Sequence, residues 1–193
     1  MIENKTSIRK RLLKKRLQLT KKEVENFSKR ILKKLTKRPE FKASRVVLLY
    51  HPIKNEVDPI PLFSKTPFPK KNKIFALPRI CKKTDRLYIH KVTDLNTLQT
   101  GRFNIKEPST KHPVISRNKL NLVITPGLAF DLKGHRIGYG KGYFDKLFKN
   151  LSTKCTKIAL AYDFQIIENI PAAKHDQKVD LIITEKRIIT TKP

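Results

Sequence analysis

Five short apolar runs, spread along the chain and separated by polar and helical segments, most restrict what this sequence can fold into. The runs are residues 46–50, 74–77, 120–125, 158–162 and 181–184. Each has the length and apolar composition of a buried β-strand rather than of a helix. Strands of this kind mixed with helical segments indicate an α/β fold with helices on both faces of one sheet.

Two helices are predicted before the first strand. Residues 5–18 and the segment after Thr20 both show apolar positions at helical spacing. Thr20 and Glu23 form a capping-box pair, so the second helix begins there, and Pro39 follows its end. The expected buried positions are Ile8, Leu12, Leu13 and Leu17 in the first helix, and Val24, Phe27, Ile31, Leu32 and Leu35 in the second. Lys34 is expected to face outward.

Two further segments are less regular. Residues 87–92 alternate between apolar and polar positions, which predicts a strand with one solvent-exposed face. Residues 59–69 are rich in proline and predict a short helix or loop. The 193 residues fit one domain, and no internal repeat or linker divides them, so we expect a single domain over residues 1–193.

The net charge of +28 admits two interpretations. It fits a polyanionic partner such as nucleic acid or a membrane surface, and it also fits a lysine-rich composition without any such partner. Residues 1–45 hold 17 Lys/Arg and 4 Asp/Glu, yet the basic excess continues through the rest of the chain. The excess is denser in the first 45 residues but is not confined to them, which favours the second interpretation.

Cysteine content and hydropathy limit the class of protein further. Cys81 and Cys155 lie far apart and outside any metal-binding spacing, so neither a zinc site nor a disulfide framework is expected. No apolar run approaches the roughly 20 residues that a membrane span needs. We therefore expect a cytoplasmic protein with no membrane partner.

Glycine is concentrated in one segment. Five of the six glycines lie between Gly127 and Gly142, after one predicted strand and before a helical pattern at residues 143–148. Glycine allows backbone N–H groups to approach a ligand closely, and a helix N-terminus adds partial positive charge. With Arg136 and Lys141, this pattern is typical of a phosphate-binding loop, although its spacing matches neither the Walker loop nor the dinucleotide fingerprint. The alternative is a tight glycine-rich turn at a sheet edge.

Several charged residues are candidates whose position alone is weak evidence. Asp145 lies in the first turn of the helix after the glycine segment and is a candidate Mg²⁺ ligand, with Asp176 as its partner near the C-terminus. Each is also explained as a surface carboxylate. Lys5 and Arg9 share one helix face, a spacing expected by chance in so basic a segment. Glu56 follows a strand end, where α/β proteins bind ligands, but a lone carboxylate there is more often a surface residue.

Taken together, these segments resemble the 5-formyltetrahydrofolate cyclo-ligase family. Residues 126–145 look like its glycine-rich signature, with Phe144 where the family usually has tyrosine. Residues 5–9 resemble its Lys-x-x-x-Arg pair, and residues 55–58 its acidic folate-contacting segment. Residues 101–108 resemble its Phe/Trp-Gly-Ile-x-Glu-Pro stretch, with Asn104 in place of glycine. The C-terminal residues 165–171 and 176–184 resemble its last segments, so the match spans nearly the whole chain in order.

The resemblance implies a three-layer α/β domain with a mixed sheet, related to the sugar-phosphate isomerase and CoA-transferase folds. It implies conversion of 5-formyltetrahydrofolate to 5,10-methenyltetrahydrofolate with ATP as co-substrate and Mg²⁺ as cofactor. The residues implied at the ATP site are Lys5, Arg9, Arg136, Gly138, Gly140, Lys141, Gly142, Tyr143 and Phe144. Those implied at the folate site are His51, Glu56, Phe103, Tyr139 and Tyr143. Catalytic roles fall on Lys141, Arg136 and Tyr143, and metal binding on Asp145 and Asp176.

The rival hypothesis is a basic RNA- or DNA-binding protein. No RNP-type aromatic pattern, zinc spacing or helix-turn-helix signature supports it. An enzyme of the resembled family gathers Glu56, Phe103, Tyr143 and Asp145 around one cleft, whereas a nucleic-acid binder presents a broad basic surface without one. We expect a monomer that binds 5-formyltetrahydrofolate and ATP and no specific nucleic acid.

Overall fold

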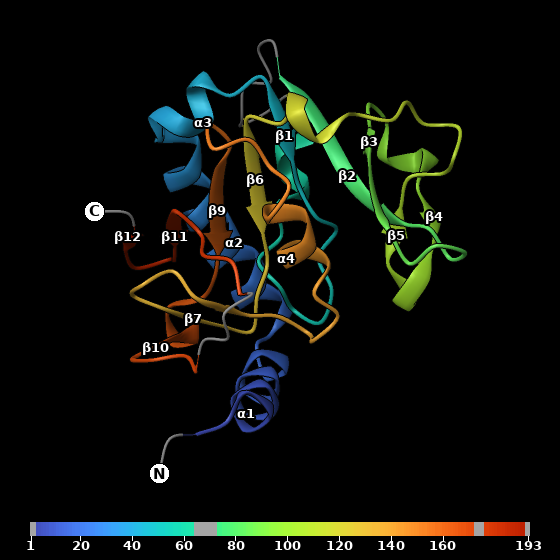
Figure 1. Ribbon diagram of the computed structural model, residues 1–193. Coiled ribbons are helices and arrows are strands. Elements are labelled where there is room, and N and C mark those ends of the chain that lie inside the picture. Colours follow the sequence, from blue (N-terminus) through green and yellow to red (C-terminus); the bar gives the residue numbers. More distant parts are fainter. Residues whose placement is uncertain (1–2, 64–72, 172–175, 192–193) are drawn as a thin grey trace.

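The computed structural model describes residues 3–63, 73–171 and 176–191. Its centre is a mixed sheet in the order β12-β11-β9-β6-β1-β2-β3, in which the five strands from β11 to β2 run parallel and the two edge strands run antiparallel (Figure 1). The strands are β1 (Val46–Leu48), β2 (Ile74–Ile80), β3 (Leu87–Lys91), β6 (Leu122–Thr125), β9 (Thr156–Leu160), β11 (Leu181–Ile183) and β12 (Ile188–Thr190). All five apolar runs and the alternating segment therefore form strands, as predicted.

Both faces of this sheet are covered, because successive side chains of a strand point to opposite sides. On one side Val47 packs in a cluster with residues of α2 (Lys21–Lys37) and α3 (Pro39–Ala43). On the other side Val46 packs in a second cluster with residues of α4 (Tyr143–Phe148). Figure 1 shows α4 in front of the sheet and α2 behind it, which confirms an α/β fold with a mixed sheet between helices.

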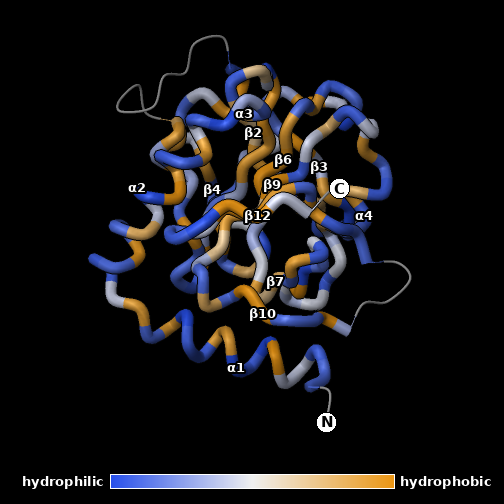
Figure 2. Tube along the Cα trace, turned by 90° about the vertical axis from the view of Figure 1, so that its left-hand side faces the viewer, coloured by the Kyte–Doolittle hydropathy of each residue, from blue (hydrophilic) through white to orange (hydrophobic). Residues whose placement is uncertain are grey.

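The first helix, α1 (Lys5–Leu17), lies outside these layers, at the bottom of the molecule in both Figure 1 and Figure 2. It packs on a small sheet in the order β10-β7-β8. These strands are β7 (Ala129–Asp131), β8 (Arg136–Ile137) and β10 (Ile166–Ile167). The buried side chains of α1 are Ile8, Leu12 and Arg16.

The buried stripe of α1 corrects the expected one. Leu17 is 52% exposed and Leu13 is only partly buried, while Arg16 takes an interior position. Residues 8, 12 and 16 recur at four-residue intervals and so share one face, whereas Leu13 and Leu17 lie on the next face of the helix. The face of α1 predicted from apolar residues alone is therefore rotated about the helix axis from the face that is buried.

The second helix begins as predicted, with the Thr20–Glu23 capping box formed. Four of its five expected core positions are confirmed, with Ile31, Leu32 and Leu35 fully buried and Phe27 packed against them, whereas Val24 is only partly buried and lies outside this cluster. Pro39 does end it, but the same proline starts α3, because proline is favoured in the first turn of a helix.

The expectation for Lys34 is wrong. Its Nζ donates a hydrogen bond to the carbonyl oxygen of Thr184, 2.9 Å away, so this side chain ties α2 to the end of β11.

The remaining elements are short. A two-stranded sheet comprises β4 (Gln99–Thr100) and β5 (Lys106–Glu107). The 3-10 helices are η1 (Ile60–Phe63), η2 (Leu95–Thr97), η3 (Arg102–Asn104), η4 (Arg117–Lys119) and η5 (Asp163–Gln165). The proline-rich segment 59–69 thus contains the short helix η1, and its part from residue 64 lies outside the described residues. Within the described ranges, no helix has the length and apolar character to cross a membrane.

Candidate active site

A cleft of about 870 Å³ opens where β1 and β6 end. Tyr50 and His51 follow β1 and line it, and Pro126 and Gly127 do the same after β6. Ligands of parallel α/β sheets bind at this carboxyl edge. The cleft wall contains every candidate site residue named from the sequence: Lys5, Arg9, His51, Glu56, Phe103, Arg136, Gly138, Tyr139, Gly140, Lys141, Gly142, Tyr143, Phe144, Asp145 and Asp176.

The glycine segment follows the cleft wall in a conformation that requires glycine. Gly140 has φ 91° and Gly142 has φ 67°, both in the left-handed region that residues with a Cβ rarely adopt. At Gly138 an added Cβ would lie 2.8 Å from Arg136 Nη1. Gly142 is also the N-cap of α4, and no side chain caps that helix end. The segment therefore turns backbone and helix N-terminus toward the cleft, as a phosphate-binding loop needs.

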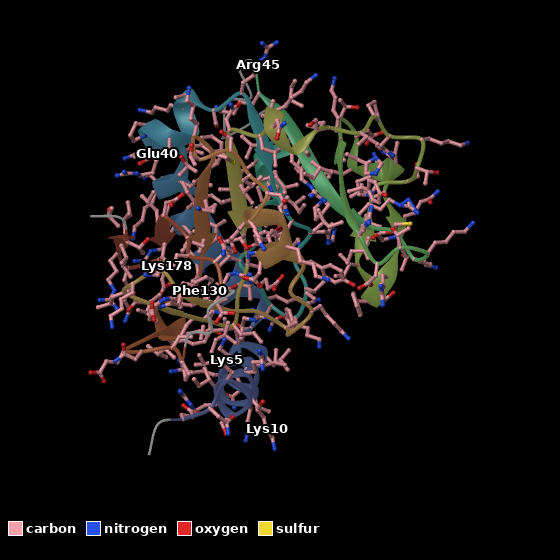
Figure 3. All side chains as sticks on the ribbon, in the orientation of Figure 1. Lys5, Lys10, Glu40, Arg45, Phe130 and Lys178 are labelled. Atoms are coloured by element: carbon pink, nitrogen blue, oxygen red, sulfur yellow. The ribbon has the colours of Figure 1, made fainter. Side chains whose placement is uncertain are left out.

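Two cations of α1 reach the same end of the cleft. Arg9 Nε donates to the carbonyl oxygen of Gly138 at 2.9 Å, and Lys5 Nζ is hydrogen-bonded to the Asp176 carboxylate. Figure 3 shows Lys5 on the side of α1 toward the protein body and Lys10 on the side away from it. The pair is therefore not a chance feature of a basic helix surface.

Lys141 adds a further cation. Its side chain lines the cleft, and the structure records no hydrogen bond or ion pair between it and another described residue.

The carboxylates of this end surround a buried guanidinium. Asp145 Oδ1 accepts a hydrogen bond from Arg136 Nη2 at 3.1 Å. Burial lowers the pKa of Arg136, and the negative charges of Asp145 and Asp176 act against that shift. The two carboxylates thus lie close enough to one cation for both to affect it.

These carboxylates fit a magnesium ion shared with a nucleotide. In the ranges that the structure covers, no group of three or more His, Cys, Asp or Glu side chains could form a metal cage. Mg²⁺, however, commonly uses one or two carboxylates and takes its remaining ligands from phosphates and water. Asp145 and Asp176 on one cleft wall, beside the glycine segment, provide such a partial ligand set.

Glu56 also lines the cleft and is only 4% exposed. Its Oε2 accepts a hydrogen bond from the Ile53 N–H at 3.1 Å, and its Oε1 lies 3.7 Å from Arg16 Nη1. Burial raises the pKa of Glu56 to about 7, although Arg16, the Ile53 N–H, Tyr139 and Lys54 oppose this shift. A buried carboxylate facing a cleft is not the surface residue that its sequence context makes more common.

The aromatic residues of the cleft differ in how they are held. Phe103 is 48% exposed and has φ 58°, and Asn104 follows with φ 59°. The turn is closed by a hydrogen bond from the Gly101 N–H to the Ile105 carbonyl oxygen at 2.8 Å. Asparagine tolerates the left-handed conformation better than most residues, so Asn104 can stand where glycine was expected.

Phe144 and Tyr143 open α4 with different partners. The ring of Phe144 packs 5.9 Å from that of Phe148 and 5.6 Å from the Arg136 guanidinium, so its contribution is packing without a hydroxyl. The Tyr143 hydroxyl donates to Asp85 Oδ1 at 2.7 Å.

Sequence reasoning missed several residues that complete the site. Asp85 accepts hydrogen bonds from both Tyr143 and Arg102 and so joins the β2–β3 turn to α4 and η3. Glu107 lines the cleft and packs against Gly101, where an added Cβ would lie 2.0 Å from its Cδ. Arg16 contacts Glu56. Only Arg16 had an available signal, its four-residue spacing from Ile8 and Leu12.

Comparison with known proteins decides the family. A model of the 5-formyltetrahydrofolate cyclo-ligase family matches residues 1–185. The chain belongs to this family. The 5-formyltetrahydrofolate cyclo-ligase of Mycoplasma genitalium is 34% identical, with 93% of this chain and 97% of that protein aligned. The Mycoplasma pneumoniae enzyme of the same name is 31% identical over 95% of this chain and 99% of its own length.

A solved structure extends the similarity to three dimensions. The NMR structure of the 5,10-methenyltetrahydrofolate synthetase of Aquifex aeolicus superposes with a TM-score of 0.85 at 36% identity, covering 98% of this chain and 93% of that one. The chain therefore shares the fold of that structure over nearly all of its length. The relation to sugar-phosphate isomerases and CoA transferases stays a prediction.

Proposed function

We propose that this protein converts 5-formyltetrahydrofolate to 5,10-methenyltetrahydrofolate with cleavage of ATP to ADP and phosphate. The observation that carries the proposal is one cleft lined by two chemically different sets of residues. One set comprises the glycine segment, Lys5, Arg9 and two carboxylates, and the other comprises the buried Glu56 and the aromatic residues. A phosphate-binding set and a pterin-binding set in the same cleft bring together the two substrates of this reaction.

At the nucleotide end, the side chains supply alignment and positive charge. Phosphoryl transfer depends mainly on positioning and charge stabilisation, with little covalent chemistry left to the protein. Lys5, Arg9 and Lys141, with the backbone N–H groups of the glycine segment, would hold the phosphates, and Arg136 would support this wall through Asp145. We assign Lys141, Arg136 and Tyr143 the catalytic roles as part of this proposal.

Asp145 and Asp176 would hold Mg²⁺ at this end. The ion would supply neutralisation of the charge on the transferred phosphate oxygens. The pairs that these carboxylates form with Arg136 and Lys5 keep them in the cleft.

At the folate end, Glu56 would accept hydrogen bonds from the N–H groups of the pterin. His51, Phe103, Tyr139 and Tyr143 line the same cleft and would contact the folate rings. Aromatic side chains suit a flat heterocycle because they offer large apolar faces.

The reaction balances as two substitutions. The oxygen of the 5-formyl group forms a bond to the γ-phosphorus, the bond to the β–γ bridging oxygen breaks, and ADP leaves with that electron pair. N10 of the folate then attacks the activated formyl carbon, the carbon–oxygen bond breaks, and phosphate leaves. N10 loses its proton, and the methenyl bridge is closed.

Absorbance of methenyltetrahydrofolate tests the proposal. Purified protein with 5-formyltetrahydrofolate, ATP and Mg²⁺ is expected to form the product, and omission of ATP is expected to abolish it. Folded protein that forms none with all three components present would refute the assignment.

Glu56 predicts a pH dependence of folate use. Its pKa of about 7 in the free protein means that the carboxyl is largely protonated at pH 6 and must lose a proton to accept pterin N–H groups. We expect the KM for folate to rise roughly tenfold between pH 7.5 and 6, following the ionised fraction of one group. In Glu56→Gln the KM is expected to be high at both pH values. The control is Glu40→Gln, which removes a surface carboxylate paired with Arg38 and should keep the wild-type profile.

The same residue predicts a change of stability with pH. The folded pKa lies above the unfolded value, so Glu56 contributes stability that is fully present below about pH 4.5 and is lost as the pH rises through 7. Glu56→Gln should therefore gain melting temperature relative to wild type across this range. A constant difference in melting temperature from pH 4.5 to 7 would show that the Glu56 carboxyl titrates as it does in the unfolded chain.

We further propose a monomer over residues 1–193, acting as one domain in the cytoplasm without a specific nucleic-acid partner. Support comes from the cleft itself, whose lining residues extend from Lys5 to Asp176 and so use most of the described chain. Because counterion release drives non-specific nucleic-acid binding, RNA is expected to dissociate by about 200 mM salt. RNA that still competes with folate at that salt would contradict this view.

A further inference from the structure

Arg16 is the largest of the fully buried side chains in the described residues, with 1% of its surface exposed. It lies in the last turn of α1, a basic helix whose other cations include the exposed Lys14 and Lys15. Burial of a charged group is costly unless that group is paired and hydrogen-bonded. The cost of burying Arg16 must therefore be offset by its hydrogen-bonding partners.

The guanidinium is bound from three separate segments. Its Nε donates to the Lys54 carbonyl oxygen at 2.9 Å and its Nη1 to the Gly127 carbonyl oxygen at 3.1 Å. Its Nη2 donates to the Tyr139 hydroxyl, and Nη1 lies 3.7 Å from Glu56 Oε1. These partners follow β1, β6 and β8. One planar group with fixed donor directions thus sets the relative position of all three.

The contact with Glu56 leaves that carboxylate available to a ligand. At 3.7 Å the Arg16–Glu56 pair is an ion pair without a hydrogen bond, and Oε1 accepts none of standard geometry from another described residue. Oε2 is bound by the Ile53 N–H. The carboxylate is therefore held in place and electrostatically supported, while one of its oxygens keeps its hydrogen-bonding capacity.

We propose that Arg16 is a positioning residue for the folate, which holds the Glu56 carboxylate and the Tyr139 hydroxyl in one arrangement ready for the pterin. This inference rests on the proposed function and adds a residue that does not itself line the cleft. Because Arg16 shares α1 with Lys5 and Arg9, the helix that presents cations to the nucleotide end also orders the folate end.

The groups that face Glu56 from every neighbouring element define its electrostatics. Arg16 comes from α1 and Lys54 from the segment of Glu56 itself, and both favour the ionised carboxyl. Tyr139 of the glycine segment also favours ionisation. The hydroxyls of Tyr50 and Tyr162 lie near enough for Glu56 to raise the pKa of each. Among these, Arg16 acts most strongly against the effect of burial.

The test is Arg16→Met, which keeps much of the volume and removes the charge. We expect the KM for folate to rise roughly 10- to 100-fold, as for loss of a charge-assisted contact, with kcat and the KM for ATP changed much less. The pH below which the folate KM increases should move upward, because Glu56 loses its main positive neighbour. Arg16→Lys should restore most of the wild-type pH profile, because lysine carries the same charge. It should restore little of the folate KM, because lysine lacks the planar guanidinium that binds several acceptors at once.

Arg11→Met is the matched control, since Arg11 is an arginine of the same helix in an exposed pair with Glu3. It should leave both KM values unchanged. If Arg16→Met folds poorly, the double variant with Arg16→Met and Glu56→Gln provides the test. Removing both buried charges should raise the melting temperature above that of Arg16→Met alone. The folate KM of the double variant should be little higher than that of Arg16→Met.

The outcomes separate the two proposals. A wild-type protein without turnover refutes the proposed function. Active wild type, with an Arg16→Met variant whose folate KM and pH profile are unchanged or whose two KM values rise alike, refutes only the role of Arg16. Additive effects of the Arg16 and Glu56 substitutions on the folate KM refute it as well.

Discussion

Lys141→Ala and Arg9→Ala are each expected to lower kcat/KM for ATP roughly 10- to 100-fold. Each removes one charge-assisted contact to phosphate, and such contacts are worth about 1.5–3 kcal/mol. Lys141 lines the cleft without a recorded partner among the described residues, so its loss should leave the melting temperature unchanged. Arg9 also binds the Gly138 carbonyl oxygen, so its loss should disturb the glycine segment in addition.

The control for both variants is Lys10→Ala, an exposed cation next to Arg9 that points away from the body of the protein (Figure 3). Lys34 is unsuitable because its side chain is bonded to Thr184. Steady-state kinetics with varied ATP and saturating folate provide the measurement. If kcat/KM for ATP falls equally in Lys10→Ala and in the two cleft variants, the effect comes from general surface charge and not from contacts with phosphate.

Asp145→Asn is expected to raise the Mg²⁺ concentration needed for half-maximal turnover by at least about 10- to 100-fold. Changes of a metal's outer-shell partners already have effects of this size, and Asp145 is proposed to bind the ion directly. The amide keeps a hydrogen-bond acceptor for Arg136 but removes the negative charge that offsets its burial. A lower melting temperature is therefore also expected.

Asp163→Asn separates these two consequences. Asp163 also binds an arginine, with Arg187 Nε donating at 2.9 Å, but it does not line the cleft. This variant should lose some stability with an unchanged Mg²⁺ titration. An Asp145→Asn enzyme with a wild-type Mg²⁺ titration would place Asp145 in a purely structural role.

The sheet was predictable because its central strands are buried on both faces. Such strands are continuous apolar runs, visible without knowledge of their neighbours. The edge strand β12 was missed, since Ile188–Thr190 is largely exposed and ends the chain without an apolar run. The two- and three-residue strands of the small sheet are too short for any periodicity to show.

The site was predictable where the chemistry depends on local sequence. Glycines at left-handed positions and a carboxylate in the first helical turn leave a pattern within a dozen residues. Arg16 left only its spacing from Ile8 and Leu12 as a signal, because its burial depends on acceptors contributed by Lys54, Gly127 and Tyr139. Asp85 was missed for the same reason: its partners, Arg102 and Tyr143, come from distant segments of the chain.

The docking of α1 sets the order in which the cleft can be completed during synthesis. Ile8 and Leu12 bury themselves against Ala129, Ile137 and Ile170. A helix of 13 residues is marginal in water by itself, so α1 cannot hold its cations in place before those partners exist. At ribosomal rates the delay between residues 8 and 170 is roughly ten to thirty seconds. The α1 segment is thus synthesised well before the residues on which it packs, and the cleft cannot be completed until Ile170 has been made.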